Sequence, residues 1–389
     1  VLCVQEDNAD SVIHMLKGAM QQLRVGNPAL LKTDIGPVID LEAQSNIQKH
    51  IDQMRSKGHS VHQLMLNPGQ DQSLAQGTFI PPTLIELPNL NDLQREVFGP
   101  VLHIIRYKYG QLEQLLEQIN AKGYGLTMGL HTRIDETIQT VIAHAEVGNL
   151  YINRNIVGAV VGVQPFGGEG LSGTGPKAGG PIYLYRLMQH CSAKKLARPF
   201  ATQAQATQPA HQPLYEVFYQ WAEKTFPQYQ LQPCPAFCAG HHYELRGPTG
   251  ESNQYVVLPR KRVLSLAEQE QDQIQQLAAI FAVGSQPVVL TENTFVLKYL
   301  AKMPKEIAQR FAVIQNIESG DFDAVLHHGS KAQLQYLQTQ IAARSGAIIG
   351  ITHLKPLDHN IPLERLVIEH AISINTAAAG GNASLMTLN

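Results

Sequence analysis

Two spacings of apolar residues alternate along residues 1–190. Short apolar runs such as 1–4 and 101–107 predict strands, and apolar residues three or four positions apart between them predict helices. Asp10 and Asp40 stand where an aspartate could cap two of these helices. Strand and helix patterns that alternate in this way favour an α/β domain with a largely parallel sheet.

A second alternating region follows residues 198–213. These sixteen positions are rich in Ala, Gln, Thr and Pro without apolar periodicity, which predicts a linker. Beyond the linker the pattern predicts strands at 255–258, 287–290, 324–327 and 347–351, and helices at 266–281, 295–301 and 332–343. The sequence therefore predicts two α/β domains, residues 1–197 and residues 214–389.

One short motif is repeated in the two predicted domains. Ile152-Asn153 and Ile374-Asn375 are each followed by a glycine five positions after the asparagine. Chance could produce this echo. Alternatively, both domains derive from one fold and each ends in a similar extended segment.

Composition and charge narrow the classes of function. The hydrophobic fraction of 44% is ordinary for a globular core. The chain has 30 Lys and Arg residues and 32 Asp and Glu residues, so its net charge is −2. This balance gives no positive charge excess that would favour binding to nucleic acid or an anionic membrane. No apolar run reaches the length of a transmembrane helix. Four cysteines and no leader-like segment indicate a cytoplasmic protein, and the strand pattern at Val1 leads us to expect a fragment.

Glycine is concentrated in residues 148–181, which read GNLYINRNIVGAVVGVQPFGGEGLSGTGPKAGGP. Such a stretch cannot form a regular helix or strand, and its exposed N–H groups suit a carboxylate or a phosphate. It contains a formal GxGxxG at Gly168, Gly170 and Gly173. Because neither a clean strand before it nor a helix after it is predicted, we reject a dinucleotide-binding interpretation of this motif.

Longer motifs carry a family resemblance. REVFGPVL at 95–102, NRN at 153–155 and VQPFGG at 163–168, in this order and spacing, resemble the C-terminal half of an aldehyde dehydrogenase. The string GAVVGVQPFGGEGLSGTGPKAGGP is similar to the L-glutamate γ-semialdehyde (pyrroline-5-carboxylate) dehydrogenases of the proline utilization A (PutA) family. The segment INTAAAGGNASLM at 374–386 resembles the C-terminal end of long PutA chains.

The resemblance implies a fold and an activity. The fold is α/β: the C-terminal part of an aldehyde dehydrogenase catalytic domain, then a second, degenerate aldehyde-dehydrogenase-like domain ending in an extended flap at 372–389. The implied parent oxidises proline with FAD and then oxidises L-glutamate γ-semialdehyde to L-glutamate with NAD⁺. In this family the C-terminal domain closes the channelling path, the protein is a homo-oligomer, and the parent can associate peripherally with a membrane.

The resemblance also assigns roles to five residues. Glu96 matches a carboxylate that accepts from the nicotinamide ribose hydroxyls, and Phe98 matches the aromatic beside that end of NAD. Gly158 and Ala159 match a loop whose N–H groups take the substrate α-carboxylate, and Phe166 matches the wall of its methylene stem. The structural alternatives are a surface ion pair for Glu96, a tight turn for Gly158, and core positions for Phe98 and Phe166.

The residues of this chain do not supply the family nucleophile. The family cysteine lies in a GQRCS-type motif that is absent from the 389 residues, so we expect no catalytic residue and no activity from this chain alone. Cys3 lies in an apolar strand and is expected to be buried and inert. Cys234, Cys238, His241 and His242 are too cramped for zinc, and no metal is expected. The alternative to an enzyme is a docking or dimerisation module with the glycine-rich loop as its interface.

Overall fold

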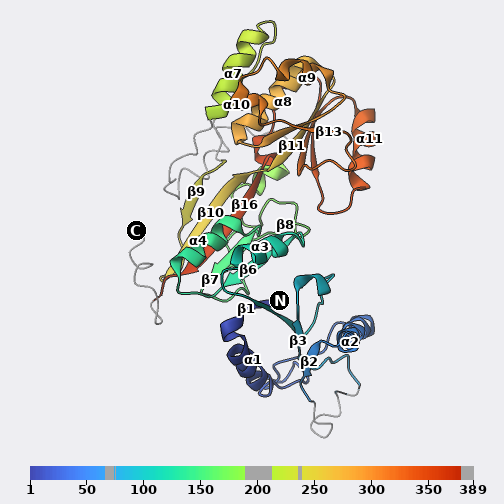
Figure 1. Cartoon of the computed structure of the whole chain (residues 1–389), viewed down its shortest axis with the longest axis vertical. Helices are drawn as coiled ribbons and strands as arrows, with labels where there is room; N and C mark the ends of the chain where they lie inside the picture. The colour runs from blue at the N-terminus through green and yellow to red at the C-terminus, as the bar shows by residue number, and fades with distance from the viewer. Residues whose placement is uncertain (66–73, 75, 189–212, 235–238, 378–389) are drawn as a thin grey trace. The chain divides into compact units, whose positions relative to one another are not determined.

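The computed structural model describes residues 1–65, 74, 76–188, 213–234 and 239–377. The chain forms two compact units, Val1–Ala121 and Lys122–Asn389. Each unit combines helices with one or more sheets (Figure 1). The mixed α/β class predicted from the alternating pattern is therefore present in both units.

The first unit is built on a sheet with the strand order β1-β4-β3-β2. β1 and β3 both run parallel to β4, and β2 pairs with β3 in the antiparallel direction. Ile51 and Ile85 are fully buried where the second helix packs on the sheet. The elements are β1 (Leu2–Gln5), α1 (Glu6–Met20), α2 (Leu41–Ser56), β2 (Ser60–Gln63), β3 (Thr83–Leu87), a 3₁₀ helix (Leu90–Asp92), β4 (Val101–Tyr107) and α3 (Leu112–Asn120).

One of the two predicted helix caps is confirmed. Asp40 accepts the N–H of Ala43 at 2.7 Å, which satisfies one of the free donors at the start of α2. The other is wrong, because α1 begins at Glu6, directly after β1. Asp10 lies inside that helix, and its carboxylate instead pairs with Arg106 at 2.7 Å.

The second unit contains a mixed sheet with the strand order β6-β7-β16-β10-β9. β7 runs parallel to both β6 and β16, whereas β10 runs antiparallel to both β16 and β9. The elements of this sheet and its surroundings are β5 (Tyr124–Gly125), β6 (Thr127–Leu130), α4 (Asp135–His144), β7 (Asn149–Ile152), β8 (Glu169–Gly170), a 3₁₀ helix (Leu184–Leu187), β9 (His242–Leu245), β10 (Glu251–Pro259), a 3₁₀ helix (Leu363–Arg365) and β16 (Val367–Asn375).

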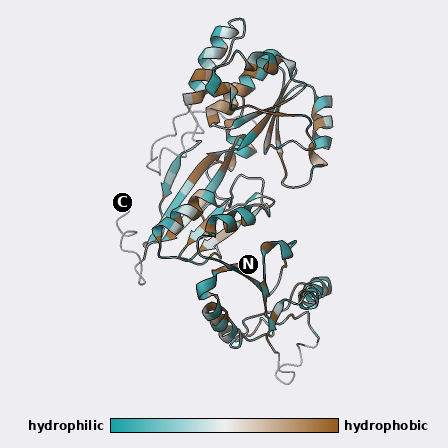
Figure 2. Cartoon of the chain, viewed as in Figure 1, coloured by the Kyte–Doolittle hydropathy of each residue, from teal (hydrophilic) through white to brown (hydrophobic). Residues whose placement is uncertain are grey.

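The same unit contains a wholly parallel sheet with the order β13-β12-β11-β14-β15. Its central strands are buried and largely brown in Figure 2, as expected for strands covered on both faces. Gly284, in the left-handed conformation, ends α8. The elements are α7 (Pro213–Thr225), β11 (Arg262–Ala267), α8 (Glu270–Val283), β12 (Gln286–Leu290), α9 (Thr294–Leu300), α10 (Lys305–Ala308), β13 (Ala312–Ile314), β14 (Ala324–His328), α11 (Lys331–Ala342) and β15 (Gly350–Leu354).

Two predicted boundaries in this unit are corrected. The helix predicted at 266–281 begins only at Glu270, because Leu266 belongs to β11, a buried strand that the pattern did not separate from the helix. The predicted linker ends early, since Pro213 already begins α7. Residues 198–212 lie outside the described residues.

The predicted domain boundary at residue 197 does not coincide with the division into compact units. β7, from the predicted first domain, pairs with β16 of the predicted second domain, and this pairing joins them in one sheet. The two segments that share the Ile-Asn motif lie side by side: Ile152 is opposite Ile374 in these parallel strands. Residues 372–375 are therefore part of an inner strand rather than a flap over an edge, and residues 378–389 lie outside the described residues.

Membrane-spanning helices were sought among the residues that the structure describes. None of those helices combines the length and the apolar composition needed to cross a bilayer.

Candidate functional site

Glu96 and Phe98 lie in the first unit, on the irregular stretch between the 3₁₀ helix Leu90–Asp92 and β4. Val97 packs against the core, so its two neighbours point outward. Glu96 is exposed, and the ring of Phe98 is 83% exposed. A core role for Phe98 is thus wrong. Gly99 fixes this stretch close to α2, because a Cβ there would lie 2.5 Å from Ile47 Cδ1.

Gly158 and Ala159 lie in the second unit, on the loop that follows β7. Gly158 has a φ of +82°, and a Cβ at that position would meet no heavy atom within 4 Å. Gly158 is exposed and Ala159 is half-buried. Among the described residues, no acceptor bonds the backbone N–H of either residue. Two neighbouring donors are therefore available to a ligand.

Two asparagines at the start of this loop bind backbone groups. Asn153 has a φ of +55°, and its side chain bonds both the N–H and the carbonyl of Thr132, at 3.0 and 2.9 Å. Asn155 accepts the N–H of Val157 at 2.9 Å. These bonds fix the backbone at the start of the loop and leave the N–H groups of Gly158 and Ala159 unoccupied.

Phe166 is half-buried, and its backbone is held on two sides. Its N–H and carbonyl both bond Ala178, at 3.0 and 2.8 Å. Asn149 donates to the carbonyl of Pro165 at 2.9 Å and accepts the N–H of Gly167 at 3.1 Å. The chain is thus held directly before and after Phe166, which fixes the backbone that carries the ring.

Lys177 completes this clamp from inside the protein. Its amine is buried and donates to Asn149 Oδ1, at 3.0 Å, and to the carbonyl of Gly167. Burial lowers the pKa of Lys177 to about 8, although the carboxylates of Glu369 and Glu169 oppose that shift. The amine therefore lies in a weakly solvated environment beside the segment that carries Phe166.

Glu369 on β16 holds the backbone of the same segment. Its carboxylate accepts the N–H of Lys177 at 2.9 Å and the hydroxyl of Tyr255 at 2.6 Å. Burial raises the pKa of Glu369, and the two hydrogen bonds work against that rise. Sequence reasoning missed both Lys177 and Glu369. The available signals were a single lysine among glycines and a single carboxylate within an apolar strand.

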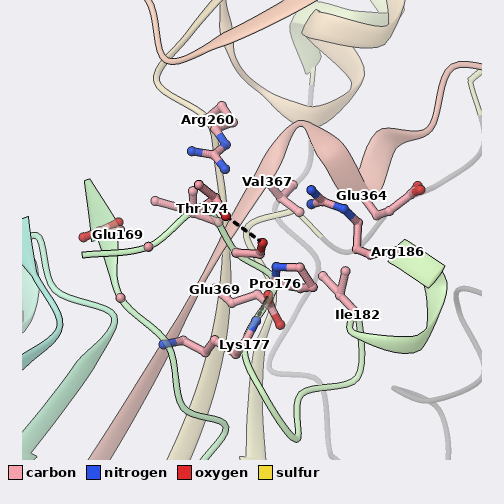
Figure 3. A pocket seen from close by; sticks show the side chains of 14 residues that line it. Glu169, Thr174, Pro176, Lys177, Ile182, Arg186, Arg260, Glu364, Val367 and Glu369 are labelled. Atoms are coloured by element: carbon pink, nitrogen blue, oxygen red, sulfur yellow. Dashed lines mark hydrogen bonds between the residues drawn. The ribbon is translucent and has the colours of Figure 1, made fainter. Parts of the chain in front are cut away.

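A small pocket lies beside Lys177 and Glu369, in the second unit (Figure 3). Its volume of about 20 Å³ has room for one or two water molecules. Arg186, Arg260 and Glu364 also line it. Burial, together with the nearby Arg365 and Arg260, lowers the pKa of Arg186. The pocket is too small for an amino acid, and its lining includes neither Gly158 nor Phe166.

The surroundings of the cysteines and histidines considered earlier do not favour a reactive thiol or a metal site. Burial raises the pKa of Cys3 and that of Cys234, the latter to about 12, which disfavours the reactive thiolate. His241 Nδ1 lies 2.9 Å from the hydroxyl of Tyr243. Cys238 and the fourth cysteine of the chain, Cys191, lie outside the described residues. Within the described residues no three His, Cys, Asp or Glu side chains are placed to hold a metal.

Comparison with known proteins identifies the class. Residues 1–192 match the aldehyde dehydrogenase family, and this part of the chain belongs to that family. Over its whole length the chain is 51% identical to the C-terminal region of the bifunctional protein PutA of Escherichia coli strain K12. It spans 30% of the length of that relative.

The chain is also similar to a second curated protein, and its fold is similar to that of a solved structure. Half of the chain (51%) is 38% identical to a 1-pyrroline-5-carboxylate dehydrogenase of Geobacillus sp. strain WCH70, over 36% of that protein. A solved structure of PutA from Corynebacterium freiburgense covers 95% of this chain with a TM-score of 0.59 at 21% identity, and the chain covers 34% of it. The predicted fold class, with an aldehyde dehydrogenase part followed by a second α/β part, is confirmed.

Proposed function

We propose that this chain supplies the part of an NAD-dependent L-glutamate γ-semialdehyde dehydrogenase that anchors the acidic end of the substrate. The observation that carries the proposal is the pair of N–H groups at Gly158 and Ala159. They lie on an open, left-handed turn, and no acceptor among the described residues occupies them. The similarity to PutA and to 1-pyrroline-5-carboxylate dehydrogenase supports this substrate class.

Each residue has a defined task in this proposal. The N–H groups of Gly158 and Ala159 bind the α-carboxylate through charge-assisted hydrogen bonds. The ring of Phe166, whose backbone is clamped, packs against the methylene stem. The exposed Glu96 and Phe98 fit the nicotinamide ribose: the carboxylate accepts from its hydroxyls, and the ring covers one side. NAD⁺, when bound, supplies the hydride acceptor.

The proposal extends to the longer protein that would contain this chain. That parent oxidises proline with FAD, passes the intermediate to the aldehyde site, and works in the cytoplasm as a homo-oligomer. Residues 1–197 then form the aldehyde dehydrogenase part, and residues 214–389 form a non-catalytic domain that closes the channelling path. We expect the purified 389-residue chain to show no NAD-dependent oxidation of the semialdehyde above a blank.

Two glycines of the same loop provide a matched test. Gly158 and Gly162 have φ values of +82° and +80°, and a Cβ at either position meets open space. Gly158→Leu and Gly162→Leu therefore introduce similar backbone strain. Loss of one hydrogen bond to a charged group costs about 1.5–3 kcal/mol. In the parent protein, we expect KM for the semialdehyde to rise about 10- to 100-fold for Gly158→Leu and much less for Gly162→Leu.

An aldehyde without an acidic group provides the specificity control. Butanal lacks the carboxylate, so its KM should be similar in Gly158→Leu and in the unchanged parent. Equal KM values for the semialdehyde in the two glycine variants would contradict the anchoring role.

A docking or dimerisation module remains the second candidate. The observation in its favour is the exposure of two side chains on the same loop, Val157 at 77% and Val161 at 91%. Exposed apolar residues on one loop are typical of a contact surface. If this candidate is correct, Val157→Ser together with Val161→Ser lowers the oligomeric state in light scattering and leaves the aldehyde kinetics unchanged.

A further inference from the structure

At the start of β10 and the end of β16, one face of the sheet is polar although it is largely buried. Glu251 and Asn253 alternate along β10, and Ser373 lies directly opposite Asn253 on β16. Asn253 and Ser373 are almost completely buried, at 2% and 1% exposure. We call Glu251, Asn253 and Ser373 the polar platform. Buried polar groups need partners, and those of the platform are found on the loop that carries Gly158.

Arg154 joins the start of this loop to the platform. Its Nη1 donates to Glu251 Oε1 and to Ser373 Oγ, both at 2.8 Å. The side chains of Arg154 and Glu251 are only 14% and 19% exposed, so water weakens this ion pair little. The guanidinium also lies 5.3 Å from the ring centroid of Tyr151, which limits its movement.

Gln164 joins the end of the loop to the same platform. Its Nε2 lies 3.2 Å from Glu251 Oε2, 3.1 Å from Asn253 Oδ1 and 3.2 Å from Ser373 Oγ. Its Oε1 accepts the N–H of Val160 at 3.0 Å. The bond from Val160, the residue directly after Ala159, fixes the orientation of the Gln164 amide.

We propose that Glu251 is a positioning residue for the substrate anchor, because its carboxylate ties both ends of the loop 154–164. One oxygen holds Arg154 and the other holds Gln164. The proposal rests on the proposed function of Gly158 and Ala159 and adds a structural determinant far away in the sequence. Glu251 touches neither the substrate nor the reacting atoms. It acts by keeping two N–H groups directed at the same point in space.

The expected effect is on substrate affinity. A loop released from the platform samples several conformations, and substrate binding must then supply the free energy that orders it. That ordering raises KM, whereas kcat for substrate already bound changes little. Glu251→Gln is a specific perturbation, because a glutamine amide offers only one acceptor. Its Nε2 would face either the Arg154 guanidinium or the donor Nε2 of Gln164.

The kinetic test uses the parent protein and compares two glutamates. Glu244 is exposed on β9 in the same sheet, so Glu244→Gln is the matched control. We expect Glu251→Gln to raise KM for the semialdehyde about tenfold with kcat within about twofold, and Glu244→Gln to leave both unchanged. Ser373→Ala removes one acceptor without disturbing the charge pair and should raise KM about threefold.

The second measurement is hydrogen exchange of the 389-residue chain, which needs no activity. In Glu251→Gln and Ser373→Ala the hydrogen-bonded amides of the loop, those of Val160, Val163 and Gln164, should exchange at least tenfold faster, while those of the parallel sheet keep their protection. Unchanged exchange across 154–164 in both variants overturns the positioning role. If exchange rises while Gly158→Leu and Glu251→Gln both leave KM unchanged, the platform orders the loop and it is the anchoring function that fails.

Discussion

The buried amine of Lys177 predicts a specific dependence of stability on pH. The pKa moves from 10.5 to about 8, mainly because of burial. At pH values below 8 the folded and unfolded chains both bind the proton, and the folded state carries the full desolvation cost. Between pH 8 and 10.5 the folded chain releases the proton while the unfolded chain keeps it. The free energy of unfolding therefore rises with pH through that interval.

The size of this rise follows from the pKa values. A pKa lowered from 10.5 to about 8 corresponds to about 3 kcal/mol. Lys177→Met removes the titrating group and keeps most of its volume. The stability difference, wild type minus Lys177→Met, should therefore increase by about 3 kcal/mol between pH 8 and 10.5. Other alkaline groups titrate in both proteins, so their contribution cancels in the difference.

Urea unfolding at several pH values measures this difference. Trp221 is the single tryptophan of the chain, and it packs among aromatic residues of the second unit, which also contains Lys177. Its fluorescence, checked by circular dichroism at high pH, reports the unfolding of that unit. Lys355→Met, at an exposed lysine, is the matched control. Parallel stability curves for wild type and Lys177→Met from pH 8 to 10.5 would refute the reasoning.

Two further predictions concern side chains whose pKa is shifted by burial: two cysteines and one histidine. Iodoacetamide at pH 8 should label Cys3 and Cys234 in urea but not in the native chain, because burial raises the pKa of both thiols; rapid native labelling of Cys3, detected by mass spectrometry, would contradict this. Burial, followed by the neighbouring His50 at an Nε2–Nε2 distance of 2.9 Å, lowers the pKa of His103 to about 4. Stability present above pH 6.5 should then fall by up to about 3 kcal/mol as the pH drops to 4, and His103→Gln should remove that slope in chemical unfolding.

Local features of the fold were predictable from the sequence. The apolar stripe of α2 and the aspartate that caps it lie within fifteen residues of each other, and both appear as expected. The strand predicted at 101–107 has those bounds. Such features depend on neighbouring residues, whose spacing records which face is buried. The start of α8 was predicted four residues too early, because the helix pattern was extended back to Leu266 across the polar run 268–273, which separates the apolar end of β11 from the apolar residues of α8.

The contacts that shape the candidate site were not predictable. The partner of Arg154 is Glu251, 97 positions away, and the partner of the Lys177 N–H is Glu369, 192 positions away. The isolated position of Glu369 in an apolar strand is a local signal, but no local pattern identifies the partner of either carboxylate, because the partners are brought together by the pairing of β16 with β7 and β10. The family motifs predict Gly158 and Phe166 as site residues, but they give no indication of the residues that hold the backbone at these positions.

The distance along the chain between Arg154 and Ser373 also bears on biosynthesis. The two residues are separated by 219 positions. At about 5–20 residues per second, a ribosome needs roughly 10–40 s to make the chain between them. During that interval the newly made glycine-rich stretch has no strand β16 to join. Until β16 is made, β7 can pair only with β6, and its other edge is open to pairing with other chains.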